Sequence, residues 1–126
     1  AIITKVVLKI KQSGPPVGIN PFTILGGLLV DIRKGSFGTS ALQITDFQAL
    51  ASAKKVGTFN KTPVAGWYSV TLNVAGQGKV NKIGLTQFRL YFTKDDNDDL
   101  GADFMKFFSG NNATGKPVIT ITYKTP

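Results

Sequence analysis

The feature that most constrains the fold of this chain is an alternation of side chains near the N-terminus. Residues 2–11 fall into two alternating sets, and a period of two over ten residues indicates a half-buried β-strand. The set expected in the core is Ile2, Thr4, Val6, Leu8 and Ile10, and the opposite set is Lys5, Val7, Lys9 and Lys11. A Gly-Pro-Pro sequence at residues 14–16 ends the strand.

Five further segments have the composition and length of strands. They are residues 27–33, 66–74, 86–93, 103–109 and 117–124, and clusters of Gly, Pro and Asn separate them. A succession of strands without long helices between them predicts an all-β fold, either an antiparallel β-sandwich or a jelly roll. With 126 residues the chain is long enough for one such domain but too short for two.

One helix is expected, over residues 45–55. Thr45 followed by Gln48 has the spacing of a capping box, and Asp46 suits the positive end of a helix. Phe47 and Leu50 would then share a face directed at the sheets. A single short helix leaves the all-β class unchanged.

The residue types that are missing argue against catalysis. The sequence contains no Cys, no His and no Glu, and its seven acidic residues are all Asp. Their absence excludes Ser-His-Asp triads, Cys nucleophiles, His or thiolate zinc sites and Glu-based glycosidase pairs. An Asp pair, a Ser-Lys dyad and an all-oxygen metal site remain open, and we expect the protein not to be an enzyme.

The net charge of +8 comes from 13 Lys and two Arg against the seven Asp. Such a chain attracts polyanions, including acidic polysaccharides. Specific nucleic-acid readers rely on Arg for bidentate base contacts, so we expect no specific nucleic-acid partner. No apolar run approaches the about 20 residues that a membrane-spanning helix needs. The first residue, Ala1, is expected to be a processed terminus or the start of a fragment.

An Asp-rich stretch at residues 95–103 is the candidate metal site. Asp95, Asn97, Asp99 and Asp103 could converge their oxygens on one Ca²⁺ ion, because alternate residues of a tight loop do so in calcium sites. The stretch departs from the EF-hand pattern, since Lys106 occupies the position of the bidentate Glu. A solvated turn that discourages edge pairing is the alternative.

Four further residues are candidates for ligand binding. Alternation places Trp67 and Tyr91 opposite the apolar faces of their strands, where aromatic rings can stack on sugars. Arg89 and Lys106, together with the lysines of residues 2–11, could contact carboxylated sugars. The alternative is that these lysines guard an edge strand against aggregation.

Several segments together have a recognisable order and spacing. They are GWYS at residues 66–69, GLTQFRLYF at 84–92, DDNDD at 95–99, FFSGN at 107–111, PVI at 117–119 and the opening IITKVVLKI at 2–10. In this arrangement the chain resembles the DNRLRE domains of exported bacterial and archaeal proteins. The resemblance implies an extracellular β-sandwich grouped with carbohydrate-binding modules for acidic polysaccharide. Such domains usually carry further strands before the point that corresponds to Ala1, which predicts either a fragment or a sandwich completed from elsewhere.

Two functions follow as hypotheses. The first is an extracellular or cell-surface module that binds acidic polysaccharide. The second is a structural subunit of a filament, sheath or matrix, in which neighbouring copies complete each other's sandwich by strand addition. Residues 2–11 are the expected donated strand in that second hypothesis, because they are terminal, long and separated from the rest by Gly14 and the two prolines.

Overall fold

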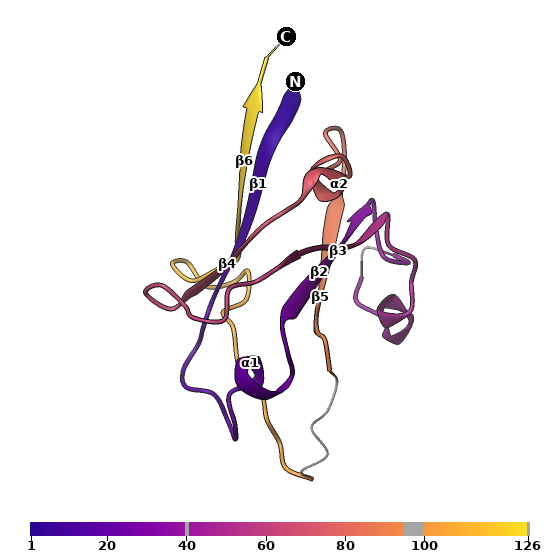
Figure 1. Cartoon of the computed structure of the whole chain (residues 1–126). Coiled ribbons are helices and arrows are strands. Elements are labelled where there is room, and N and C mark those ends of the chain that lie inside the picture. The colour runs from indigo at the N-terminus through magenta and orange to yellow at the C-terminus, as the bar shows by residue number, and fades with distance from the viewer. Residues whose placement is uncertain (40, 95–99, 126) are drawn as a thin grey trace.

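The fold is an all-β sandwich of two three-stranded antiparallel sheets, seen here in a computed structural model that describes residues 1–39, 41–94 and 100–125. One sheet has the order β4-β1-β6 and the other β3-β2-β5. Figure 1 shows both chain ends at the same end of the molecule, where β6 runs beside β1. The strands are β1 (Ile2–Lys11), β2 (Leu28–Lys34), β3 (Ala53–Thr58), β4 (Trp67–Thr71), β5 (Thr86–Phe92) and β6 (Val118–Lys124).

β1 is the central strand of its sheet, and a bulge divides it. Val6, Leu8 and Ile10 are buried in the core, as their alternation predicts. The register against β6 shifts between Ile3 and Lys5. The alternation therefore breaks there, and the expected inward placement of Ile2 and Thr4 is wrong, because both are exposed while Ile3 packs against the core.

The second sheet supplies the opposite wall of the core. Leu28, Val30 and Ile32 of β2 are buried, and the register pairs Val30 with Leu90 and Ile32 with Phe88. The inward residues of β5 are only half-buried, because β5 is an edge strand of its sheet. The core is therefore dense under β1 and β2 and thinner under β5.

An aromatic cluster closes one end of the core around α1 (Pro21–Ile24). Asn20 caps this helix by accepting a hydrogen bond from the Phe22 backbone N–H, and Pro21 suits the first helical position. The cap directs Phe22 into the core, where its ring stacks on Tyr68 at 4.3 Å between centroids. Phe92 meets the same ring edge-on at 5.2 Å.

The helix predicted over residues 45–55 is wrong. The chain instead forms a single 3-10 turn at η1 (Ile44–Phe47), followed by β3. The capping box is present two residues earlier, with the Gln43 backbone N–H donating to the Asp46 carboxylate. Phe47 and Leu50 are exposed rather than packed on a sheet. Pairing with the free side of β2 satisfies the backbone of residues 53–58 better than an isolated helix would.

The strand predicted over residues 103–109 is reduced to two isolated bridges. Phe104 pairs with Val17, and Phe107 pairs with Gln12. These bridges hold the segment against the residues that follow β1 but do not extend a sheet.

The second short helix, α2 (Val74–Gln77), follows β4, and Asn73 caps it by accepting a hydrogen bond from the Gly76 backbone N–H at 3.0 Å. No helix in the described parts of the chain is long and apolar enough to cross a membrane.

Candidate functional site

The outer face of the β4-β1-β6 sheet brings lysines, hydroxyl side chains and the Trp67 ring together. Antiparallel pairing places Lys9 between Ser69 and Val118, and Lys11 beside Trp67. Lys5 pairs with Thr122 on the same face. We call this surface the lysine face, and its members are Lys5, Lys9, Lys11, Trp67, Ser69, Thr71, Thr120 and Thr122.

The centre of the lysine face is a shallow hollow that opens to solvent. The hollow has a volume of about 600 Å³ and is lined by Lys9, Trp67, Ser69 and Thr120 together with Val64 and Val118. The Lys11 Nζ lies 5.8 Å from the centre of the Trp67 ring and 6.0 Å from that of Phe108. These distances allow a cation–π contact, which holds a positive charge beside an aromatic surface.

Arg89 and Tyr91 lie on the other sheet, where they form a buried polar cluster with Asp31. The Asp31 side chain is 2 % exposed, and its Oδ2 lies 2.7 Å from an Arg89 guanidinium nitrogen. The Tyr91 hydroxyl donates to Asp31 Oδ1 at 2.8 Å, and the Lys55 backbone N–H donates to the same oxygen at 2.9 Å. The carboxylate thus has three donors in a site largely closed to water.

The cluster shifts the ionisation of two of its members. Burial alone would raise the pKa of Asp31, but the hydrogen bonds from Arg89, Lys55 and Tyr91 outweigh it and hold the pKa below its usual value of 3.8. Burial, reinforced by the hydrogen bond to the Asp31 carboxylate, raises the pKa of Tyr91. Near neutral pH Asp31 is therefore ionised and pairs with Arg89, while Tyr91 keeps the proton that it donates to the carboxylate.

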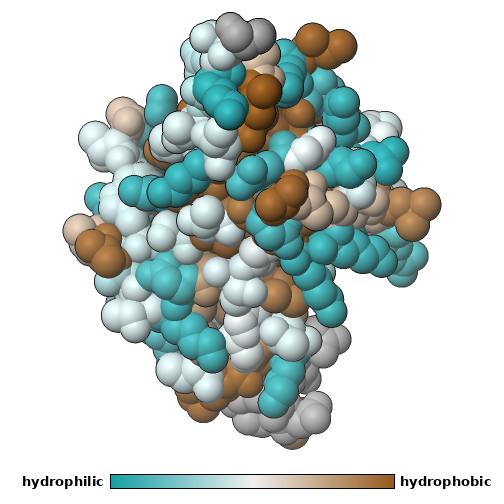
Figure 2. Space-filling model, turned by 45° about the horizontal axis from the view of Figure 1, so that its top comes forward, coloured by the Kyte–Doolittle hydropathy of each residue, from teal (hydrophilic) through white to brown (hydrophobic). Residues whose placement is uncertain are grey.

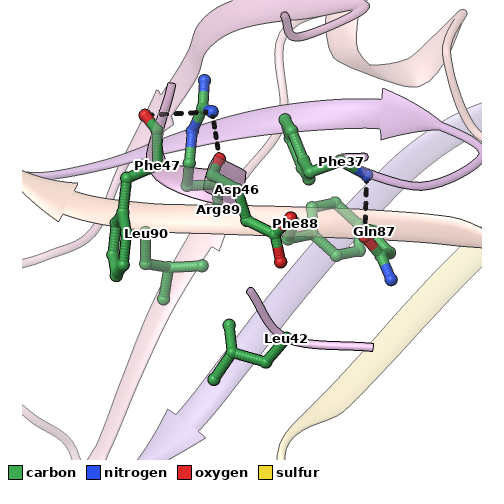
Figure 3. Close-up of a pocket in the computed structure, with 8 residues that line it drawn as sticks. All are labelled: Phe37, Leu42, Asp46, Phe47, Gln87, Phe88, Arg89 and Leu90. Carbon is green, nitrogen blue, oxygen red and sulfur yellow. Dashed lines mark hydrogen bonds between the residues drawn. The ribbon is translucent and has the colours of Figure 1, made fainter. Parts of the chain in front are cut away.

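Arg89 also anchors the segment between β2 and β3. Its Nη1 donates to the backbone carbonyls of Asp46 at 2.9 Å and Ala49 at 2.6 Å, and its guanidinium lies 4.5 Å from the Phe37 ring centre. Figure 3 shows the guanidinium turned toward the carbonyls of Asp46 and Phe47, beside a hollow of about 370 Å³ that Leu42 also lines. Arg89 is therefore occupied by internal bonds.

The four predicted ligand-binding residues do not form one site. Trp67 lies on the lysine face, whereas Arg89 and Tyr91 are on the opposite sheet and bonded to Asp31. The Lys106 side chain is exposed, and its backbone carbonyl accepts from the Ser13 N–H just beyond the end of β1.

Asp103 is the described member of the predicted calcium site. Asp95, Asn97 and Asp99 lie outside the described residues. Asp103 Oδ1 accepts a hydrogen bond from the Ile19 backbone N–H at 2.8 Å, so one of its oxygens fastens a loop. The described residues contain no group of three potential metal ligands. The calcium site stays a prediction.

Two features of the structure were not predicted from the sequence. The first is the Asp31 cluster, which could have been suspected from a single carboxylate within the apolar run of residues 28–32. The second is the hydroxyl row of the lysine face, contributed by Ser69 and Thr71 on β4 and by Thr120 and Thr122 on β6. The period-two Thr spacing in β6 was visible, but its alignment with the lysines required the register.

Comparison with known proteins finds no relative of this chain. No family model matches it, and neither a curated protein nor a solved structure does so. The resemblance to DNRLRE domains therefore stays a prediction.

Proposed function

We propose that the chain is a non-catalytic extracellular module that binds acidic polysaccharide through the lysine face. The observation that supports this proposal most directly is the alignment of Lys5, Lys9 and Lys11 in one row on an exposed sheet, with Trp67 at one end. Alternate residues of a strand are about 6.6 Å apart, so Lys9 and Lys11 are direct neighbours in this row, and Lys5 lies about 13 Å from Lys9 beyond Val7.

Each group on the face has a defined task in this proposal. Lysine ammonium groups attract carboxylates without demanding one geometry, which suits a flexible, repetitive ligand. The Trp67 ring offers a surface on which a sugar ring stacks. The hydroxyl groups of Ser69, Thr71 and Thr120 can donate to and accept from sugar hydroxyls.

The lack of catalysis is part of the same proposal and rests on composition. The chain has no His, Cys or Glu to act as a general base or nucleophile. Of the described carboxylates, Asp31 is bonded to Arg89 and lies on the sheet opposite the lysine face. No carboxylate is aligned with Trp67 in the strand register of that face.

Affinity electrophoresis in gels that contain alginate or a neutral glucan tests the proposal. We expect retardation in alginate that weakens with salt, because exposed charges are screened. Changing Lys5, Lys9 and Lys11 to Gln should abolish it, and Trp67→Ala should weaken it. The matched control changes the exposed Lys34, Lys54 and Lys55 of the β3-β2-β5 sheet to Gln, which removes the same charge from the other sheet. Equal losses in both triple variants would reduce the effect to net charge and overturn the proposed site.

The second candidate function is a structural subunit of an extracellular filament, sheath or matrix. It is favoured by the exposed apolar side chains at the β6 edge of the sandwich, near the end where both termini lie. Figure 2, in which that end comes forward, shows hydrophobic side chains exposed among hydrophilic ones. The predicted donor, residues 2–11, is paired on both sides within its own chain. In this candidate the free edges of the sheets, rather than β1, are the surfaces that join copies.

A further inference from the structure

β6 is exposed along its whole length although half of its side chains are apolar. Val118, Ile119 and Ile121 are 37–41 % exposed and Tyr123 is 61 % exposed. Ile121 pairs with Val6 and Ile119 with Leu8, so these isoleucines face the same side as the buried core of β1. They stay accessible because the second sheet does not cover β6. Ile121 and Tyr123 border a groove of about 350 Å³.

The outer edge of β6 presents a regular set of backbone groups. The Leu72 N–H donates to the Val6 carbonyl, so even-numbered residues of β1 bond to β4 and odd-numbered ones to β6. The register pairs Val7 with Thr120, which turns the N–H and C=O groups of even-numbered β6 residues toward β1. The backbone N–H and C=O groups of Ile119, Ile121 and Tyr123 therefore point in the plane of the sheet toward its free edge.

The other sheet edges are covered or charged. At β4, the Asn60 N–H donates to the Ser69 carbonyl at 3.1 Å, and the Ser69 N–H donates to the Asn60 side chain at 2.7 Å. β3 carries the exposed Lys54 and Lys55. The segment that includes Leu42 and Phe47 lies beside β5.

β6 has no such protection. Its residues 118–123 include no charge and no Pro, and within the described chain only β1 pairs with it. Exposed, uncharged edges of this kind invite another strand.

We propose that β6 pairs antiparallel with β6 of a second copy about a two-fold axis at Ile121. In this register Ile121 opposes its own counterpart, and Ile119 opposes Tyr123. Each of these residues has its backbone groups on the free edge, so the pairing makes hydrogen bonds at every edge position. The result is a continuous six-stranded sheet.

The side chains and charges fit the same register. The inner face gains an Ile–Ile pair and two Ile–Tyr pairs, and aromatic–aliphatic cross-strand pairs are favourable. On the outer face Thr120 opposes Thr122, and Lys124, the one charged residue of β6, opposes Val118. No like charges are brought opposite each other. The two lysine faces become neighbours on one surface, which would let one polysaccharide chain contact both.

This inference deepens the second candidate function and rests on it. A two-fold contact uses the same surface on both copies and closes on itself, so β6 pairing alone gives a dimer. Growth into a filament would require a further contact between dimers.

Cysteine scanning tests the register. The chain has no Cys of its own, so every disulfide that forms involves the introduced residue. Opposed residues in a hydrogen-bonded antiparallel pair have Cα atoms about 5.5 Å apart, within disulfide range. Residue 119 lies four positions from its counterpart, about 14 Å along the strand. We expect Ile121→Cys to form covalent dimers under mild oxidation at least tenfold faster than Ile119→Cys. Ile83→Cys, at a 97 % exposed loop position, is the matched control.

Light scattering after size exclusion gives the independent measurement. The unmodified chain should have twice its 13.5 kDa mass at high concentration. Ile121→Lys, which puts two like charges at the axis, should leave a folded monomer by circular dichroism, and Ile83→Lys should still dimerise. Dimers that crosslink equally well at positions 119, 121 and 83 would overturn the β6 register while keeping the assembly candidate. A monomer at every concentration would overturn both the β6 pairing and the candidate function as an assembly subunit.

Discussion

Replacing Arg89 with Met should destabilise the fold by about 4 kcal/mol, because it leaves the Asp31 carboxylate buried without its counter-ion. Removing one partner of a buried ion pair costs about 3–5 kcal/mol. Asp31 keeps two donors, the Lys55 N–H and the Tyr91 hydroxyl, which limits the loss. The carbonyls of Asp46 and Ala49 lose their donor as well, at about 1 kcal/mol each.

Urea unfolding measures the difference in unfolding free energy between the variant and the unmodified chain. The melting temperature should fall by about 15 °C, at about 4 °C per kcal/mol for a chain of this size. The sequence offers a matched control, because Arg33 is its other arginine and lies on the same face of the sheet. Arg33 donates to the Leu50 carbonyl at 3.0 Å. We expect Arg33→Met to cost about 1 kcal/mol.

The unfolding free energy that Arg89→Met removes should depend on pH in a direction set by Asp31. Its pKa is lowered in the folded state, so its stabilising contribution is present above the usual value of 3.8 and disappears as the pH falls through the lowered pKa. The penalty of Arg89→Met should therefore be larger at pH 7 than at pH 3. Equal penalties for the two arginine variants, or a penalty independent of pH between 3 and 7, would refute the idea that the ion pair holds this sheet together.

Two other changes have defined outcomes. Gly18 has φ +72° and a Cβ there would lie 2.1 Å from the Ala102 carbonyl oxygen, whereas Gly14 has φ +82° and open space around it. Gly18→Ala should therefore cost about 2–3 kcal/mol more than Gly14→Ala in urea unfolding, because only the first combines a strained backbone with a clash. Calcium titration by calorimetry should release heat with the unmodified chain and little with Asp95→Ala, and no heat with either would leave the solvated-turn alternative.

Much of the strand pattern could be read from the sequence because period-two alternation is local. The segments at residues 2–11, 27–33, 66–74, 86–93 and 117–124 all contain strands close to the predicted ones. The outward direction of Lys5, Lys9 and Trp67 followed from the same alternation.

The failures lie where a neighbour decided the local structure. Residues 45–55 contain a helix-like pattern, but residues 53–58 became β3 because β2 had a free edge to offer. The bulge between Ile3 and Lys5 redirected Ile2 and Thr4, and no sequence period signals it. Residues 103–109 have the composition of a strand, yet they lack a partner strand long enough to extend a sheet.

The sequence alone therefore determined the class of fold and the polarity of the two faces in most of the strands, since both depend on the order of side chains along the chain. Only the tertiary structure decided which faces are covered. Arg89 and Trp67 are both outward residues by alternation, but the segment around Phe37 and Asp46 folds over Arg89 and leaves the lysine face open. The apolar face of β6 is exposed for the same reason, because its burial depends on how far the opposite sheet reaches.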